Sequence, residues 1–469
     1  MLGDMAADIA YRQAPVQNVA INNTSSRTEE ITRQKHSRSS YTESSPLTSR
    51  NNSLVFRPAK RPMSAPQETI AIINASGRQA ESLIRNVTAV GYRVRAQMRN
   101  RFGVIAQEIS TNPHVTVLEG ELYTKQQPKA DVDVTKDGPA LSGSGIGVNY
   151  ELIKNLFRGC QLAFINTTFY GDEIKIGQAV ADAAKEAGVK HFIYSSMPDH
   201  STYHKDWPSL PLWAPKQQVE EYVQKIGLPA TFVYTGIYNN NFTSLPFPLF
   251  CMDLQKDGSF LWKAPFHPDA KLPWLDAEHD VGPAILQIFK DGVKKWGNGK
   301  RIALAFESLT PLEVCEAFER GLDRKVRYER GAIEVRVGIP DGYRTQLDGL
   351  NKFYDLKIQD PAKQLPYFGD KALEDDYPEV AMELWEGPRS MEEYAREVFP
   401  LEEQANGRLW MIEDGENGHA AEPAASTTNG TAHATPARST ADDEDDEEDD
   451  DDDGLVMKGP ARNEQEWLA

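Results

Sequence analysis

Residues 69–80 read TIAIINASGRQA, an apolar run that passes directly into a turn of small residues. An apolar strand followed by such a turn and then by a helix is the βα unit that opens a dinucleotide site. The turn must let backbone N–H groups approach a pyrophosphate, and the start of the helix supplies positive partial charge to hold it. The stretch therefore predicts the strand, turn and helix of a nucleotide-binding domain.

The turn departs from the usual glycine pattern. Where G-x-x-G-x-x-G is expected, the chain has Asn74, Gly77 and Ala80. Asparagine can adopt left-handed backbone angles and alanine still permits close packing of the helix, so the geometry of the turn is retained. Apolar residues at helical spacing continue to residue 90, and Gly91 is a typical stop signal. We predict a helix over residues 78–90 and a second strand over 92–98.

Strands and helices alternate through the rest of this region, as is typical of a parallel sheet with helices on both faces. We predict an α/β fold with a Rossmann-type doubly wound parallel sheet over residues 67–238, interrupted by a looped insertion at 123–149. Residues 239–400 are less regular and rich in Pro and Trp, which predicts a smaller, irregular α/β C-terminal lobe. Within it, residues 280–283 read DVGP and predict a helix capped by Asp280 with Pro283 near its start.

Both ends of the chain are expected to be disordered. Residues 1–66 are rich in Ser, Thr, Asn and Arg, and residues 401–469 form a polar tail. That tail contains twelve consecutive acids at 442–453, which contribute −12 of the net charge of −19 and leave −7 for the rest of the chain. This balance does not indicate a basic nucleic-acid surface. An acidic run is either a solvated tail or a contact for a basic partner.

The three cysteines, Cys160, Cys251 and Cys315, are far apart and lack the spacing of metal ligands. They fit a reducing compartment without disulfides. No apolar run approaches the length of a membrane span, and the N-terminus lacks the core of a signal peptide. We therefore expect a soluble intracellular protein with no metal site, no membrane contact and no direct contact with nucleic acid.

Polar residues and glycine follow three of the predicted strands where each strand ends. Because the carboxyl ends of parallel strands meet at one edge, which forms the ligand crevice of an open α/β sheet, we expect these residues to lie together. They are Asn166, Thr167, Ser195, Ser196, Thr235 and Gly236.

Reductases of the short-chain type use a Tyr-x-x-x-Lys pair, in which the lysine binds the ribose and lowers the pKa of the tyrosine. The corresponding segment here has Leu212 and Lys216. Leucine cannot transfer a proton, so we predict no catalytic residue and no enzymatic activity. Ser195 and Ser196 stand where such enzymes carry a serine, although serine at a strand end is also common in loops.

The choice between NAD and NADP is usually made at the end of the second strand. An acid there binds the ribose hydroxyls, and a base meets a 2′-phosphate. This chain has Arg99 and no acid between residues 97 and 101. Arg99 would tolerate or favour NADP, or it is simply a solvated arginine at a strand end.

Six segments together resemble the NmrA-like family, the nitrogen metabolite repression regulators of filamentous fungi. The likeness covers residues 68–400. The segments are NASGRQ at 74–79, AFINTT at 163–168, YSSMPDH at 194–200, WAPK at 213–216, GIYNNNF at 236–242 and WLDAEHDVGP at 274–283.

This resemblance implies an atypical short-chain dehydrogenase fold that binds NAD(P), preferably oxidised, without consuming it. It implies a negative co-regulator that binds and inhibits a GATA-type zinc-finger activator and acts in the nucleus, the cytoplasm or both. The cofactor-binding positions that it implies are Asn74, Ala75, Ser76, Gly77, Arg78, Gln79, Arg99, Asn166, Thr167, Thr168, Ser196, Lys216, Tyr234, Gly236, Ile237 and Tyr238.

Two other functions are compatible with these residues. The first is an NADPH-dependent reductase of the isoflavone- or quinone-reductase kind, in which Lys216 would assist the chemistry. The second is a scaffold with a vestigial site, in which substitution of Gly77 would change nothing. No motif requires a dimer, so we expect a monomer.

Overall fold

The computed structural model describes residues 68–125, 146–243, 250–334 and 341–405. The predicted disordered segment at 1–66 and the acidic run at 442–453 lie outside these ranges. Within them, no helix combines the length and the apolarity that crossing a membrane requires.

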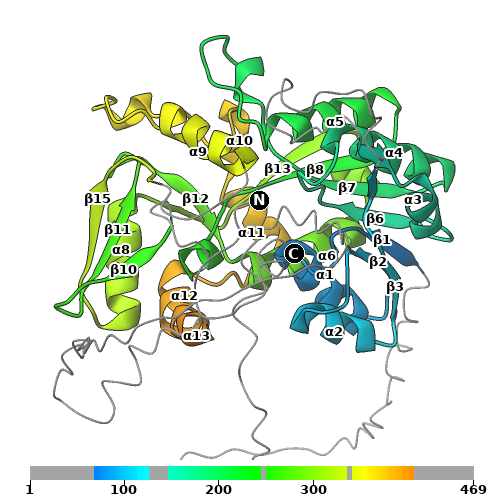
Figure 1. The fold of residues 1–469 in the computed structure, drawn as a ribbon, viewed down its shortest axis with the longest axis horizontal. Helices are drawn as coiled ribbons and strands as arrows, with labels where there is room; N and C mark the ends of the chain where they lie inside the picture. Colours follow the sequence, from blue (N-terminus) through cyan, green and yellow to red (C-terminus); the bar gives the residue numbers. More distant parts are fainter. Residues whose placement is uncertain (1–67, 126–145, 244–249, 335–340, 406–469) are drawn as a thin grey trace, which may run out of the picture. The chain divides into compact units, whose positions relative to one another are not determined.

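A parallel sheet of seven strands organises the first lobe, in the order β13-β8-β7-β6-β1-β2-β3 (Figure 1). The order reverses beside β1, between β2 and β6, which is where doubly wound sheets bind their ligands. The predicted Rossmann-type fold is therefore confirmed. The strands are β1 (Thr69–Ile72), β2 (Arg93–Met98), β3 (Val115–Glu119), β6 (Leu162–Ile165), β7 (His191–Ser196), β8 (Ala230–Thr235) and β13 (Lys300–Leu304).

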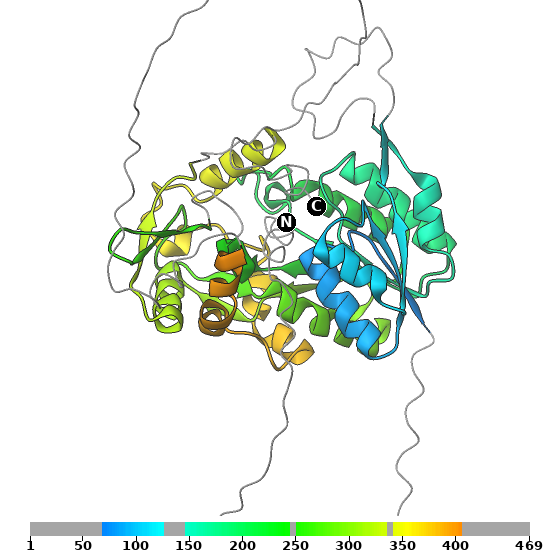
Figure 2. The same cartoon turned by 60° about the horizontal axis from the view of Figure 1, so that its bottom comes forward.

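Helices cover both faces of this sheet (Figures 1 and 2). Because side chains alternate along a strand, Ile70 and Ile72 pack on one face, whereas Ala71 and Ile73 pack on the other. The first face holds α1 (Arg78–Ala89), α2 (Val104–Thr111) and α6 (Ala277–Asp291). The second face holds α3 (Tyr150–Leu156), α4 (Glu173–Glu186) and α5 (Ala214–Lys225).

The sheet takes its seventh strand from beyond the boundary that we predicted between residues 238 and 239. Strand β13 pairs with β8, and α6 packs against α1. The boundary therefore does not separate the sheet from the second lobe. The predicted insertion also contains regular structure at its ends, because β4 (Tyr123–Lys125) pairs antiparallel with β5 (Ile146–Val148).

The start of α6 corrects a prediction. Asp276, not Asp280, caps this helix and accepts from the N–H groups of Glu278 and His279, each at 3.1 Å. Pro283 consequently lies inside the helix. Asp280 is fully buried and binds the His279 ring instead, so its carboxylate is unavailable as a cap.

The second lobe packs around aromatic residues such as Trp262, Trp274 and Phe318. It contains two small sheets, β10 (Met252–Leu254) with β11 (Phe260–Ala264) and β15 (Val326–Arg330), and β9 (Ile237–Tyr238) with β12 (Leu272–Leu275) and β14 (Glu307–Leu309). Its main helices are α8 (Pro311–Leu322), α9 (Asp341–Phe353), α12 (Met391–Glu397) and α13 (Phe399–Ala405). Shorter elements are α7 (Val293–Trp296), α10 (Lys371–Asp376), α11 (Glu379–Leu384), η1 (His200–Thr202), η2 (Asn239–Thr243) and η3 (Pro361–Lys363).

The structure also corrects the predicted start of the C-terminal tail at residue 401. Residues 401–405 belong to α13, in which Glu402 and Glu403 are buried. The aromatic residue that opens this helix, Phe399, is fully buried in the second lobe. Its burial holds the helix in place beyond the point where the polar composition begins.

Candidate functional site

The turn between β1 and α1 has the backbone geometry that the sequence predicts. Asn74 adopts φ +52°, in the left-handed region. Its carbonyl oxygen accepts from the Gly77 N–H at 3.0 Å, which closes the turn. The N–H of Asn74 donates to the side-chain oxygen of Gln97 at 3.0 Å, and the N–H of the buried Ala75 donates to the Gln97 carbonyl at 2.9 Å. Gln97, which we had not selected as a site residue, therefore holds the turn from β2.

Gly77 lies where the chain approaches itself closely. A Cβ at this position would lie 2.9 Å from Asn74 Nδ2 and 3.2 Å from Asn74 O. Gly77 also offers no side chain to cap α1, and the half-buried Ser76 makes no cap there either. The first turn of the helix is therefore arranged to receive an external anion.

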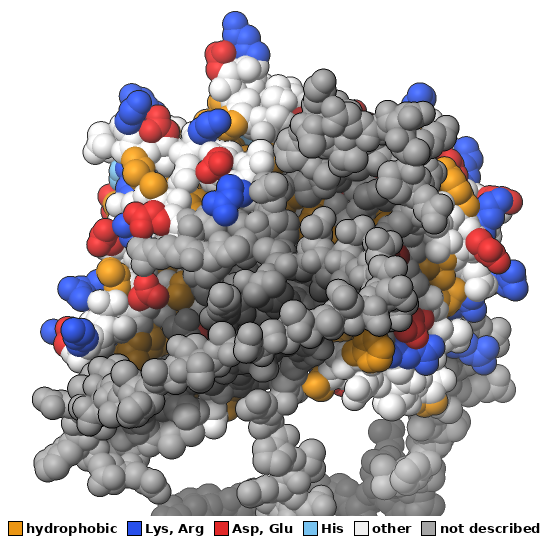
Figure 3. Space-filling view, in the orientation of Figure 1, with side chains coloured by type: hydrophobic (Ala, Val, Ile, Leu, Met, Phe, Trp, Pro, Cys, Tyr) orange, Lys and Arg blue, Asp and Glu red, His pale blue; other side chains and the backbone are white. Residues whose placement is uncertain are grey.

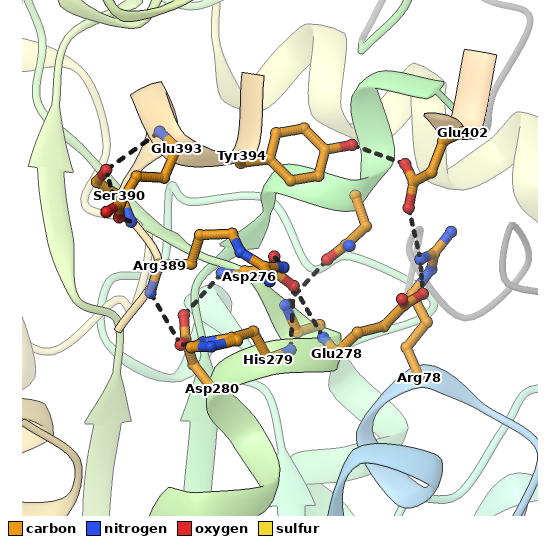
Figure 4. Close-up of polar contacts among 12 residues, drawn as sticks. Arg78, Asp276, Glu278, His279, Asp280, Arg389, Ser390, Glu393, Tyr394 and Glu402 are labelled. Carbon is orange, nitrogen blue, oxygen red and sulfur yellow. Dashed lines mark hydrogen bonds and ion pairs between the residues drawn. The ribbon is translucent and has the colours of Figure 1, made fainter. Parts of the chain in front are cut away.

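The Arg78 side chain is occupied inside the protein (Figure 4). It is 1% exposed and forms ion pairs with Glu278 from α6 and, at 3.7 Å, with Glu402 from α13. Burial alone would lower the pKa of the guanidinium, but Glu278 and Glu402 more than offset this, so its pKa lies above its ordinary value. Arg78 can therefore bind a phosphate through its backbone, while its side chain links the turn to α6 and α13.

Gln79 connects the same turn to the other side of the site. Its Nε2 donates to the Tyr238 hydroxyl of β9. The Gln79 Oε1 atom is buried and has no hydrogen-bond partner within the described residues. Two predicted positions that lie 159 residues apart in the chain are thus in direct contact.

Five predicted residues from three segments meet in one cavity at the end of β2, which we call the β2 cavity. It encloses about 420 Å³ of empty space, part of it open to solvent. The predicted residues that line it are Asn74, Arg99, Asn166, Thr167 and Thr168.

Two tyrosines complete the β2 cavity and were not predicted. The Arg99 guanidinium lies over the Tyr170 ring, 4.5 Å from its centroid, and Tyr123 enters from β4. Burial raises the pKa of Tyr170 to about 12, so both rings offer neutral stacking surfaces. Neither was selected from the sequence, because Tyr123 opens the segment that we predicted as a looped insertion and Tyr170 lies in a bend before α4.

Lys216 lies in a closed polar network beneath the crevice. Its Nζ donates to the Thr167 carbonyl at 2.6 Å and pairs with Glu173 Oε1 at 3.2 Å. Both charged side chains are almost completely buried, at 2% and 4% exposure. The neighbouring phenol, Tyr194, has a pKa raised well above its usual value, mainly by burial. A phenol with such a pKa is a poor proton donor at neutral pH.

Leu212, the residue that we matched to the catalytic tyrosine of short-chain reductases, lies in the packed interior. Its side chain is 2% exposed and packs in the core of the second lobe. Its backbone N–H donates to the Gln346 side chain of α9 at 3.0 Å. The position is therefore used for packing between segments.

Ser196 and Tyr234 lie differently from our expectation. Both hydroxyls donate to Glu220 Oε2 of α5, at 2.8 and 2.6 Å, and Arg301 Nε donates to the other carboxylate oxygen at 2.6 Å. Both side chains therefore point to the α5 face of the sheet rather than along its edge. Strands β7 and β8 are buried throughout, so no alternation of polarity in the sequence marks which face each side chain takes.

The remaining predicted residues, Gly236, Ile237 and Tyr238, line a second cavity between the ends of β7 and β8 and the second lobe. We call it the aromatic cavity. No described residue lines both this cavity and the β2 cavity.

The charges on the described surface are mixed. On the face drawn in Figure 3, lysine and arginine side chains stand next to aspartate and glutamate. Among the described residues, no cluster of His, Cys, Asp or Glu has the arrangement of a metal site.

The comparisons with known proteins agree on one family. The model of the NmrA-like family matches residues 66–395. The nitrogen metabolite repression protein nmr of Neurospora crassa is 62% identical, over the whole of both chains. The nitrogen metabolite repression protein nmrA of Emericella nidulans is 49% identical, over 75% of this chain and the whole of its own.

A solved relative has the same fold. The crystal structure of Nmra, a negative transcriptional regulator, is 51% identical and matches with a TM-score of 0.64, over 74% of this chain and the whole of its own. Structures of Nmra in complex with NAD and with NADP match with the same TM-score.

Proposed function

The chain belongs to the NmrA-like family, and we propose that it is a negative regulator of transcription in nitrogen metabolite repression that binds NAD(P) without turning it over. Three findings support the proposal: two relatives are named nitrogen metabolite repression proteins, a solved relative is described as a negative transcriptional regulator, and that relative has been solved with NAD and with NADP.

One observation carries the proposal: the phosphate-binding turn is intact, whereas the catalytic pair is not. Asn74 and Gly77 keep the geometry of the turn. Leu212 cannot donate a proton, and the Lys216 ammonium is committed to Glu173 and Thr167. Such a site can hold a dinucleotide but lacks the groups that would move a proton to a carbonyl.

The β2 cavity fits the adenosine end of the dinucleotide. The Tyr170 and Tyr123 rings offer surfaces for a base, and Arg99 stands at the end of β2, where a 2′-phosphate would lie. Residues 97–101, at this strand end, contain no acid that would repel the 2′-phosphate. We therefore expect both NAD and NADP to bind. In the regulator that we propose, the oxidised forms bind more tightly than the reduced forms.

The partner that we propose is a GATA-type zinc-finger activator, bound without direct contact between this chain and nucleic acid. A zinc finger that binds DNA is basic, because it neutralises DNA phosphates. This chain carries a net charge of −7 outside its acidic run. The opposite charges of finger and chain favour their association. We propose that the chain acts as a monomer in the nucleus, the cytoplasm or both.

Titration calorimetry on the full chain tests the cofactor proposal. We expect NAD⁺ and NADP⁺ to bind more tightly than NADH and NADPH, and NADPH to remain unoxidised with a panel of quinones and carbonyls. The control is Gly77→Asp, which places a Cβ against Asn74 and a negative charge at the phosphate position. It should lower affinity by about 100-fold, the worth of one or two lost charge-assisted hydrogen bonds.

Oxidation of NADPH by any member of the panel would indicate the alternative function, an NADPH-dependent reductase of the isoflavone- or quinone-reductase kind. That activity should then disappear in Lys216→Ala. Absence of binding to all four dinucleotides would leave only the scaffold function.

Binding of a recombinant GATA-type finger tests the partner proposal. We expect the full chain to retain the zinc-loaded finger and to lose about tenfold in affinity between low and physiological salt, because the attraction is electrostatic. The finger stripped of zinc is the control. Equal retention of both forms, or affinity that is independent of salt, would contradict the proposal.

A further inference from the structure

Lysine side chains lie together where strands β7, β8 and β13 begin. These strands are neighbours in the sheet (Figure 1). Because they are parallel, their first residues share one edge, and this edge is opposite the ligand crevice. Five exposed lysines stand at this edge or at the ends of the helices that lead to it. We call them the lysine edge: Lys190, Lys225, Lys290, Lys294 and Lys300.

Trp296 links two segments of the lysine edge. Its ring is buried, and the Lys300 Nζ atom lies 4.3 Å from the ring centroid. The Nζ atom of Lys295, the residue next to Lys294, lies 4.5 Å from the same centroid. Residues 290–300 contain four lysines and one acid, a net charge of +3. Positive charge is therefore concentrated in a short segment.

Lys190 and Lys225 reach the same edge from the neighbouring strands. Lys190 precedes His191, the first residue of β7, whose ring is hydrogen-bonded at 2.8 Å to Thr231 Oγ1 of β8. Thr231 is in turn the register partner of Lys300 on β13. Lys225 is the last residue of α5, in front of the turn that leads into β8. The five lysines thus come from adjacent strands and from the connections between them.

The lysine edge lacks acidic partners. None of its five members forms an ion pair with a residue that the structure describes. Two acids beside it, Asp291 and Glu383, are already paired with Lys295, at 3.1 and 3.8 Å. Asp291 also accepts from Trp296 Nε1 at 2.8 Å. Neighbouring ammonium groups repel one another, so an anionic segment that covers them is favoured.

The acidic run at 442–453 is an anion of this kind on the same chain, with a charge of −12. The last described helix, α13, ends at residue 405, so residues 406–441, 36 in number, connect it to the run. A connection of that length can span up to about 120 Å, whereas a domain of about 300 residues has a radius of gyration of about 19 Å. The run can therefore reach the lysine edge. Tethering gives it a millimolar effective concentration, so even a weak contact is populated.

We propose that the acidic run at 442–453 binds the lysine edge of its own chain. The contact joins carboxylates to ammonium groups at the surface and needs no pocket. It lies at the edge of the sheet opposite the crevice and leaves the dinucleotide site open. A basic partner of the acidic run would have to displace the lysine edge. This inference does not rest on the proposed regulatory function, because it concerns a contact within one chain.

Cross-linking of the full chain with a carbodiimide tests the proposal, because this reagent joins a carboxylate directly to an ammonium group in contact with it. At low salt we expect cross-links from the acidic run to Lys290, Lys294 and Lys300. They should disappear at about 1 M NaCl, where the Debye length is about 3 Å. A mixture of ¹⁵N-labelled and unlabelled chains should give cross-links within single chains. Cross-links mainly between the two labels would show that the edge binds a second copy, and would overturn the proposal.

Three lysines of the second lobe serve as references, because they are exposed and also form no ion pair with a described residue: Lys256, Lys325 and Lys357. Equal yields at the references and at the lysine edge, or no cross-link to the lysine edge, would also overturn the proposal.

Two triple variants give a second measurement that does not depend on the reagent. Replacement of Lys290, Lys294 and Lys300 by Gln removes three surface charges. At low salt, cleavage of the acidic run by a glutamate-specific protease should then accelerate by about threefold or more, the sum of three exposed charge pairs at the low end of their range. Replacement of the three reference lysines by Gln should leave the cleavage rate unchanged. Equal rates in the two triple variants would refute the contact, and the cross-linking of the unmodified chain stands without either variant.

Discussion

Replacement of Lys216 by Met is expected to lower the free energy of unfolding by about 3–5 kcal/mol, the usual cost of removing one partner of a buried ion pair. The Met side chain keeps the apolar stem but removes the ammonium. The carboxylate of Glu173, which is 4% exposed, is then left without its 3.2 Å partner, and the Thr167 carbonyl loses a donor at 2.6 Å. Urea unfolding of the full chain measures the change.

A double-mutant cycle separates the ion pair from general packing. If the unpaired carboxylate causes the loss, Lys216→Met combined with Glu173→Gln should be more stable than Lys216→Met alone. Lys154→Met is the matched control. Lys154 pairs with Glu186 at 3.4 Å, but both side chains are more than half exposed, so its removal should change stability little. Equal losses at positions 154 and 216 would contradict the prediction.

A large loss of stability in Lys216→Met would mean that Lys216 stabilises the fold, which bears on function. In a short-chain reductase, the corresponding lysine must reach the ribose and act on a neighbouring tyrosine. Here the ammonium is 2% exposed, and the residue four positions earlier, Leu212, packs in the second lobe. A regulator that binds a dinucleotide without reaction can retain such a lysine for stability alone.

Substitution of Gly282 by Ala is expected to lower the free energy of unfolding by about 3 kcal/mol, at the upper end of the range for overpacking. A Cβ there would lie 2.3 Å from the Ser82 carbonyl oxygen, and backbone cannot move aside as the tip of a side chain can. Separation of α6 from α1 would also break the bond from the Gly282 N–H to Ser82 Oγ, now 2.9 Å. The loss should exceed the helix-propensity gain of about 1 kcal/mol from Gly to Ala.

Gly349→Ala is the matched control for this helix–helix contact. Gly349 also lies inside a helix, α9, but a Cβ there would meet Leu210 Cδ2 at 2.9 Å, the end of a flexible side chain. We expect Gly349→Ala to alter stability by less than about 1 kcal/mol. Dinucleotide affinity should fall only in Gly282→Ala, because α1 begins at the turn that we propose as the phosphate site. A stable Gly282→Ala variant would mean that α1 and α6 can separate without cost.

The turn was predictable because its geometry is local. The left-handed φ of +52° at Asn74 is a property that asparagine tolerates and most residues do not, so residue type alone indicated it. The edge formed by the ends of β6, β7 and β8 followed from the rule that successive parallel strands share a direction. The helix stop at Gly91 was readable for the same local reason.

Other features of the site depend on segments that are distant in sequence. The partners of Arg78 are Glu278 and Glu402, which lie 200 or more residues away. Glu402 stands in a stretch whose composition predicted a tail, but the burial of Phe399 and the contacts of Glu402 with Arg78 and Tyr394 hold a helix there. The spacing of charges along the chain contains no sign of these pairs.

The sequence by itself determined the alternating strands and helices and the left-handed turn at Asn74. Each of these depends on residue type and on neighbours within a few positions. Only the tertiary structure decided that β13 completes the sheet, that Ser196 and Tyr234 turn to Glu220, and that Lys216 is sealed by Glu173. The reason is physical: in strands buried on both faces and in ion pairs between distant segments, the packing of the whole chain selects the partner, and local propensity does not.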